Sequence, residues 1–173
     1  MRSIRLLIDG YNVLFQSHLV GRGRAQGWLP KARERLLKLI ADGLEPENQA
    51  RTTVVFDAAK FGETPVDYSF NELIDVRFAK EYDEADDLLE VLIRQAPQPK
   101  QLNVVSSDLR IRRCALARRA NSIDAETFLD QTEAGRANTW FDSSVDNNSR
   151  SADDEPLEKE LGADDVEYWL RKF

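Results

Sequence analysis

The chain has 173 residues, of which 42% are hydrophobic and 32% are charged, with one cysteine and one histidine. This length accommodates one domain with its own core, and so few cysteines and histidines exclude a disulfide framework and a cysteine- or histidine-based zinc site. No apolar run approaches the ~20 residues of a membrane span, so we expect a cytoplasmic protein without a secretion signal.

Four short apolar segments are typical of buried strands, and amphipathic patterns typical of helices lie between and after them. The predicted strands are 3–9, 51–57, 73–79 and 102–108. The predicted helices are 29–44, 83–96 and 108–120, and a short strand or turn followed by a capped helix is predicted for 122–131. This alternation predicts a three-layer α/β/α fold with a mostly parallel central sheet.

Composition divides the chain into a body and a polar C-terminal part. We expect one domain over residues 1–140, an acidic linker over 141–163 and a short helix over 164–173 that docks on the domain. Residues 141–173 contain ten acids and four bases, so they carry most of the net charge of −7. The body is therefore nearly neutral, and net charge does not exclude a polyanionic partner.

Three of the predicted strands end on an aspartate, namely Asp9, Asp57 and Asp108. Because the carboxyl ends of parallel strands meet at one edge of a sheet, where ligands bind, we expect these side chains to converge. The third strand leads into an acid-rich helix, on which Asp86 and Glu90 share a face at i,i+4 spacing. Crowded carboxylates repel one another unless a cation neutralises them, and an all-oxygen site suits Mg²⁺ or Mn²⁺. Such a site is suited to phosphodiester hydrolysis.

Each acid also has a simpler interpretation. A strand-end aspartate is commonly a helix N-cap or turn residue, and both Asp108 and Asp83 precede predicted helices. Asp57 would also suit a phosphoacceptor domain, but that chemistry prefers an acidic pair after the first strand, where Asp9 stands alone. A phosphohydrolase with an aspartyl nucleophile needs D-x-D, whereas this chain has D-G-Y. The joint pattern of strand-end and helical acids favours a metal site.

Polar residues interrupt the apolar stretch LLIDGYNVLF at residues 6–15. Asn12 is predicted to hydrogen-bond the Asp9 carboxylate, and Gly10 to let the chain turn without a side chain that blocks the site. Residues 13–15 are predicted to return to the core.

Basic residues lie beside the predicted acidic edge. Five arginines fall within residues 110–119, just after Asp108, and residues 16–28 form a glycine- and arginine-rich predicted loop. Solvated arginines on a helix face are the alternative, but phosphate contacts from this set would steer a nucleic acid toward the acids. The candidate RNA-binding residues are Arg22, Arg24, Arg110, Arg112 and Arg113.

The motifs IDGYNVL, VVFDA, EADDLLE and VVSSD, in this order and at these separations, resemble those of the NYN-domain nucleases. The resemblance is to their YacP-like bacterial branch, and the closing VEYWLRKF resembles its C-terminal helix. It implies a PIN-like fold and a Mg²⁺- or Mn²⁺-dependent endoribonuclease that acts on single-stranded or messenger RNA, in association with ribosomes. We expect a monomer or a weak dimer. A non-catalytic RNA- or ribosome-binding adaptor with the same fold is the alternative.

The resemblance also implies roles for individual residues. Asp9, Asp86 and Asp108 match acids that hold the catalytic metal, and Asn12 matches the amide that supports the site. Three further acids match metal ligands or their neighbours, namely Asp57, Asp87 and Glu90. Glu84 stands where the family usually has threonine, and both Asp86 and Asp87 are candidates for the main helical ligand.

Overall fold

The computed structural model describes residues 3–20, 26–58 and 65–142. The predicted loop arginines, nearly all of the predicted linker and the whole predicted C-terminal helix lie outside the described residues. The described strands are β1 (Leu6–Asp9), β2 (Thr52–Phe56), β3 (Tyr68–Phe70), β4 (Ile74–Phe78), β5 (Asn103–Val105) and β6 (Asn121–Ile123). The described α-helices are α1 (Gly10–Gln16), α2 (Trp28–Gly43), α3 (Pro46–Gln49), α4 (Ala85–Gln95), α5 (Leu109–Ala117) and α6 (Ala125–Glu133). Three 3₁₀ turns are also described, η1 (His18–Val20), η3 (Pro99–Gln101) and η4 (Ala137–Phe141).

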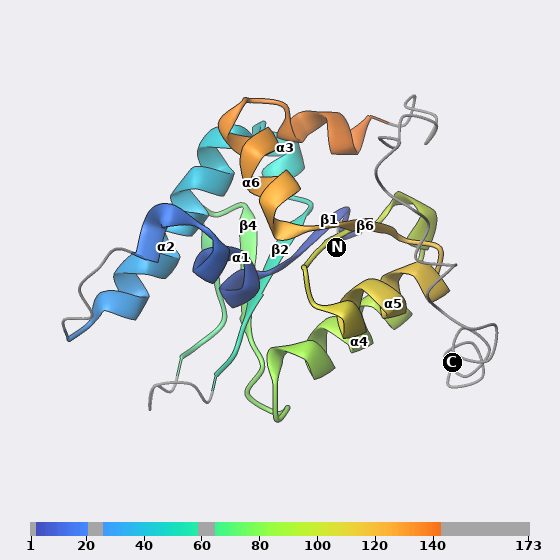
Figure 1. Cartoon of the computed structure of the whole chain (residues 1–173), viewed down its shortest axis with the longest axis horizontal. Coiled ribbons are helices and arrows are strands. Elements are labelled where there is room, and N and C mark those ends of the chain that lie inside the picture. Colours follow the sequence, from blue (N-terminus) through green and yellow to red (C-terminus); the bar gives the residue numbers. More distant parts are fainter. Residues whose placement is uncertain (1–2, 21–25, 59–64, 143–173) are drawn as a thin grey trace.

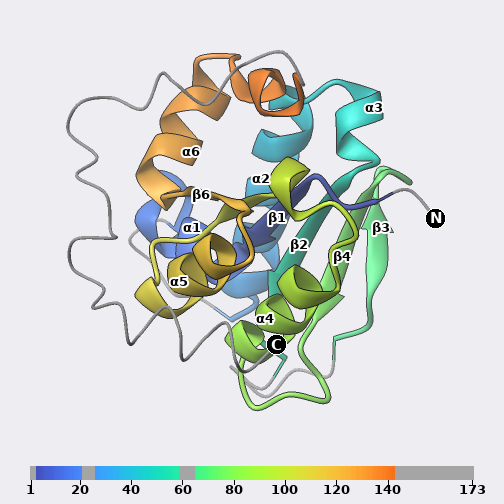
Figure 2. The same cartoon turned by 90° about the vertical axis from the view of Figure 1, so that its right-hand side faces the viewer.

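The six described strands form one sheet in the order β3-β4-β2-β1-β5-β6. Five of them run parallel, and only the edge strand β3 is antiparallel to its neighbour β4 (Figure 2). The predicted mostly parallel α/β fold is therefore confirmed. The sequence analysis did not predict β3, because this strand has three residues, two of them exposed, and so lacks the apolar run of a buried strand.

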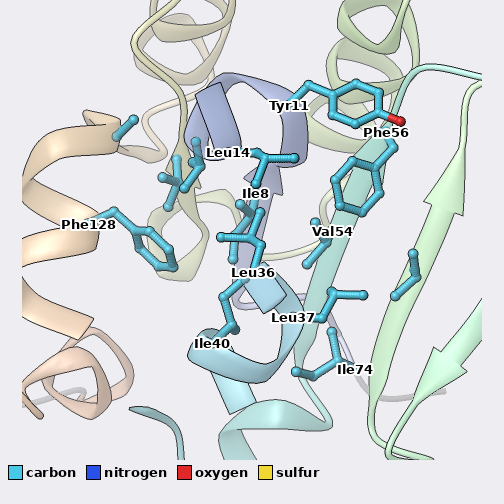
Figure 3. Packing of buried hydrophobic residues seen from close by; sticks show 14 of the residues in the cluster. Ile8, Tyr11, Leu14, Leu36, Leu37, Ile40, Val54, Phe56, Ile74 and Phe128 are labelled. Atoms are coloured by element: carbon cyan, nitrogen blue, oxygen red, sulfur yellow. The ribbon is translucent and has the colours of Figure 1, made fainter. Parts of the chain in front are cut away.

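Helices cover both faces of the sheet, as a mostly parallel sheet requires. On one face, α1, α2 and α6 pack over Ile8, Val54 and Ile74, with Leu36 of α2 and Phe128 of α6 among the contacts (Figures 1 and 3). On the other face, α4 and α5 pack over the alternate strand residues, which include Leu7, Val55 and Val104. Because both sets of alternate residues are buried in β1, β2 and β5, these three strands have no exposed face.

Helix α1 was not predicted, since it begins directly at the end of β1. Val13 and Leu14 are buried as predicted, but Phe15 is 43% exposed, so the expectation for that residue was wrong. The predicted reason for Gly10 was also wrong. A Cβ at Gly10 would overlap the ring of Phe56, so glycine is needed for close packing against β2.

Strands β1 and β5 are adjacent and parallel, and their following helices lie on opposite faces of the sheet. Helix α1 packs on the face of α2 and α6, whereas α5 packs on the face of α4. Such a divergence is a topological switch point, where open α/β sheets bind ligands. No helix among the described residues is long and apolar enough to cross a membrane.

Candidate active site

The β1–β5 edge combines polar side chains from three strand ends. In a strand, alternate residues share a face. Asp9 therefore lies on the same face as Leu7, Asp57 on the same face as Val55, and Ser106 on the same face as Val104. Leu7, Val55 and Val104 all belong to the cluster beneath α4 and α5. The three polar residues therefore extend one row of side chains toward α4 and α5 at the carboxyl edge of the sheet.

Asp9 is held by a hydroxyl and a backbone amide. Ser106 Oγ donates a 2.9 Å hydrogen bond to Asp9 Oδ2, and accepts the N–H of Asp108 at 3.1 Å. The N–H of Asn12 lies 3.5 Å from Asp9 Oδ1, so Asp9 is also the N-cap of α1. Both contacts orient a carboxylate that is only 6% exposed.

The predicted hydrogen bond from the Asn12 side chain to Asp9 is not formed. Instead, Asn12 Oδ1 accepts the N–H of Ser107 at 2.9 Å and the Gln16 side-chain amide at 3.3 Å. Ser107 Oγ in turn accepts the N–H of Ala125 at 3.0 Å. The Asn12 side chain thus joins α1 to the turn after β5, and only the backbone N–H of Asn12 contacts Asp9.

Asp9 and Asp86 have no ion pair among the described residues, and both have raised pKa values. Burial, with smaller contributions from the charges of Asp86 and Asp108, raises the pKa of Asp9 to about 7 against the opposing hydrogen bonds from Ser106 and Asn12. Burial and the nearby charge of Asp108 raise the pKa of Asp86 to about 6, despite the opposing effect of Arg110. The three aspartates predicted from the first strand, the fourth strand and the helix therefore lie close enough for their charges to interact.

Two of the predicted site acids also cap helices. Asp108 is the N-cap of α5, since its Oδ1 accepts the N–H of Arg110 at 2.8 Å. Asp57 accepts the N–H of Ala85 at 2.6 Å, and so satisfies the first turn of α4 from outside the helix. The N-cap position itself is Glu84, whose side chain makes no capping bond, so the suggested capping role of Asp83 was wrong.

The remaining two predicted ligands are paired with arginines. Arg110 Nε donates to Glu90 Oε1 at 2.6 Å, and Arg110 Nη2 donates to Asp87 Oδ1 at 2.6 Å. Arg94 Nη2 donates to Glu90 Oε2 at 2.7 Å. Asp86 and Glu90 lie four residues apart in α4, as predicted, but Glu90 shares Arg110 with Asp87.

The predicted RNA-binding arginines differ in whether they form ion pairs. Arg110 is committed to Asp87 and Glu90, whereas no ion pair of Arg112 or Arg113 is found within residues 3–20, 26–58 and 65–142. Both are half-buried, and their Nε atoms have no hydrogen-bond partner in that part of the chain. Arg22 and Arg24 lie outside it.

Comparisons with known proteins identify the fold and the family. The family model for the YacP-like NYN domain matches residues 6–172. The chain belongs to this family. Among solved structures, it is similar to a tryptophan-to-leucine variant of Rae1 (YacP) from Bacillus subtilis, with 25% sequence identity and a TM-score of 0.60 over 78% of this chain and 77% of that one.

A second structure of Rae1 (YacP) from Bacillus subtilis has 24% identity and a TM-score of 0.56, over 78% of this chain and 75% of that one. Comparison with curated proteins gives no match. Membership of the YacP-like NYN family thus agrees with the mostly parallel α/β fold.

The donor set of this NYN domain fits a hydrated divalent cation. Within the described residues, no three Asp, Glu, His or Cys side chains already form a group that could hold a metal ion. However, Mg²⁺ keeps several waters and needs only one or two protein carboxylates. The charge of Asp86 disfavours ionisation of Asp9, and a bound cation would offset that repulsion.

The sequence analysis missed Ser106 and Ser107, which organise the edge of the NYN domain. Ser106 is fully buried and holds both Asp9 and the turn after β5, while Ser107 joins α1 to α6. A signal was present, because two hydroxyls directly follow a central strand in VVSSD. Its meaning depends on which residues lie opposite, and these come from β1 and α1.

Proposed function

We propose that this protein is a Mg²⁺- or Mn²⁺-dependent endoribonuclease. Asp9 and Asp86 would hold the ion with Asp108 close by, and Ser106 would orient Asp9. When bound, the ion would lower the pKa of an attacking water and stabilise negative charge on the scissile phosphate and the leaving oxygen.

The observation that carries the proposal is the pair of crowded aspartates at the switch point. Both have a raised pKa because Asp9 is buried and Asp86 half-buried next to other acids, with no ion pair of either among the described residues. Such an arrangement costs free energy in the metal-free protein and is relieved by a divalent cation. Perturbed pairs of this kind in a ligand-binding crevice are typical of catalytic sites.

The substrate class rests on the family and on the basic residues. NYN-family membership supports RNA as the substrate, and Arg112 and Arg113 follow Asp108 on α5 without a described ion pair. We propose that these two arginines, with Arg22 and Arg24, contact phosphates of single-stranded or messenger RNA. Cytoplasmic action on ribosome-associated RNA by a monomer or weak dimer is part of the same proposal.

The test is a cleavage assay on single-stranded RNA with Mg²⁺ or Mn²⁺, and with EDTA as the metal-free control. Wild type should cleave, whereas Asp9→Asn and Asp86→Asn should lose more than the ~10- to 100-fold that follows loss of an outer-shell partner. Asp130→Asn, an exposed residue on α6, is the matched control and should retain activity.

Two results would overturn the proposal. Undiminished cleavage by both variants would remove the site, and no cleavage by wild type would remove the activity. In the second case, RNA binding that tolerates EDTA and both substitutions would support the adaptor instead.

A further inference from the structure

Four charged side chains connect α4 to α5 next to the candidate active site. We call this group the α4–α5 clasp; it consists of Asp87, Glu90, Arg94 and Arg110. Arg110 reaches from α5 to α4 with two nitrogens, Nε to Glu90 and Nη2 to Asp87, each at 2.6 Å. Arg94 pairs with the second oxygen of Glu90 at 2.7 Å. Both helices are therefore joined by hydrogen bonds between fully charged groups.

Glu90 is the buried member of the α4–α5 clasp, and it depends on its arginine partners. Its side chain is 4% exposed, and each of its oxygens accepts from an arginine. An ionised carboxylate at such a position requires compensation, and charge-assisted bonds to guanidinium groups supply it. Glu90 is thus fully engaged, in contrast to Asp9, which has no guanidinium partner among the described residues.

The clasp is directly connected to the acids of the candidate site. Asp87 follows Asp86 in α4, and Arg110 is two residues after Asp108 in α5. The N–H of Arg110 also donates to Asp108 Oδ1 at 2.8 Å, so the same residue holds Asp108 by its backbone and α4 by its side chain. A shift of the Arg110 guanidinium group would therefore move Asp86 relative to Asp108.

We propose that Arg110 is a positioning residue, whose two-pronged pairing with Asp87 and Glu90 sets the separation between Asp86 and Asp108. This inference rests on the proposed function, since it concerns the geometry of the same acids. It differs from two expectations raised by the sequence, namely that Arg110 binds RNA phosphates and that Glu90 holds the metal.

Steady-state kinetics of RNA cleavage distinguish these roles. Arg110→Gln and Glu90→Gln should each lower kcat by roughly 10- to 100-fold, the range for loss of a supporting partner, with KM nearly unchanged. Arg110→Lys should not restore kcat, because an ammonium group cannot reproduce the planar fork that bonds two carboxylates. A raised KM at unchanged kcat, or full rescue by lysine, would overturn the proposal in favour of phosphate binding.

Asp87→Asn is a milder variant for the case that the others do not fold. Asp87 is 36% exposed, and its replacement leaves buried Glu90 paired with both arginines. Its kcat should fall by less than about tenfold. The Asp87→Asn/Arg110→Gln double variant should be no worse than Arg110→Gln alone, because Arg110→Gln already removes the pairing with Asp87. An unchanged kcat in Asp87→Asn, or additive losses in the double variant, would contradict the clasp.

Arg77→Gln is the matched control, since it removes a partly exposed arginine that is paired with Asp75 at 2.6 Å on β4. It should leave kcat unchanged.

Mn²⁺ affinity provides a further comparison: Arg110→Gln and Glu90→Gln should weaken it in parallel. Weaker binding in Glu90→Gln with tighter binding in Arg110→Gln would identify Glu90 as a metal ligand and overturn the proposal.

Amide hydrogen exchange separates failure of the clasp from failure of the proposed nuclease activity. The first-turn amides of α5, at Arg110 and Arg112, bond to Asp108 and should exchange faster in Arg110→Lys than in wild type. Unchanged protection would contradict the clasp even in a protein without activity. Faster exchange together with an inactive wild type would leave the clasp intact and remove only the nuclease.

Discussion

Asp86 and Asp87 are neighbours in the first turn of α4, yet their environments are opposite. Burial and the charge of Asp108 raise the pKa of Asp86 to about 6. The hydrogen bond from Arg110 lowers the pKa of Asp87 below its ordinary value. One peptide unit therefore separates an acid of the switch-point edge from an acid of the α4–α5 clasp.

The same contrast holds between the two buried carboxylates, Asp9 and Glu90. Both are almost inaccessible to solvent, but Glu90 bonds two guanidinium groups whereas Asp9 bonds one hydroxyl and one distant amide. A compensated carboxylate stabilises the fold, and an uncompensated one retains affinity for a cation. This difference indicates that the arginine partners, more than burial, distinguish the acids that support the fold from the acids proposed to hold the ion.

The largest expected effect is on cleavage by the two neighbouring variants. Asp86→Asn should lower kcat/KM by more than ~100-fold, because it removes an acid proposed to hold the ion, whereas Asp87→Asn should lose less than about tenfold. Both substitutions are isosteric and remove one charge from the same helical turn, so each is the control for the other. Equal losses would show that the contrast in environment has no functional meaning.

Stability should change in opposite directions when the buried carboxylates are neutralised. In metal-free protein at pH 8, Asp9→Asn should raise the free energy of unfolding by up to about 4 kcal/mol, since its pKa of about 7 lies some three units above the ordinary value. Glu90→Gln should lower it by roughly 3 kcal/mol, because two arginines lose their charged partner. Urea denaturation measures both, and changes of the same sign would refute the comparison.

The pH dependence of unfolding sharpens this difference. Because the pKa of Asp9 is raised to about 7 in the folded protein, the folded state binds more protons than the unfolded state between about pH 4 and 7. Its contribution to stability is therefore fully present below about pH 4 and is lost as the pH rises through 7. The wild-type-minus-Asp9→Asn difference in unfolding free energy should fall over this range in EDTA, and fall less in saturating Mg²⁺. A flat difference in EDTA would argue against a raised pKa.

A smaller effect is expected at Ser106. The hydrogen bond from its hydroxyl lowers the pKa of Asp9, against the effect of burial. Ser106→Ala should therefore raise that pKa further and move the acidic limb of the pH–activity profile to higher pH. Loss of a hydrogen bond to a charged group is worth about 1.5–3 kcal/mol, equivalent to roughly ten- to a hundredfold in activity. Ser122→Ala is the matched control, because the Ser122 hydroxyl is buried without a hydrogen-bond partner in the described residues. Equal profiles for both variants would remove the role of Ser106.

Much of the fold could be predicted from local pattern. Apolar runs located four of the strands, and periodicity located α2, α4 and α5 to within a few residues. The C-terminal aspartates of those strands also indicated which edge carries the acids. Helix α1 and strand β3 could not be predicted, because α1 continues an apolar run without a break and β3 is short and exposed.

The sequence by itself therefore determined the chain order of four strands and of α2, α4 and α5, the acidic edge and the membership of Asp9, Asp86 and Asp108 in it. Only the tertiary structure decided which acids acquire arginine partners. Helical spacing placed Asp86 with Glu90, but Arg110 approaches from α5 and selects Asp87 and Glu90. The physical reason is that compensation depends on distances of a few ångströms between α4, α5 and the strand ends, and the packing of those elements sets these distances.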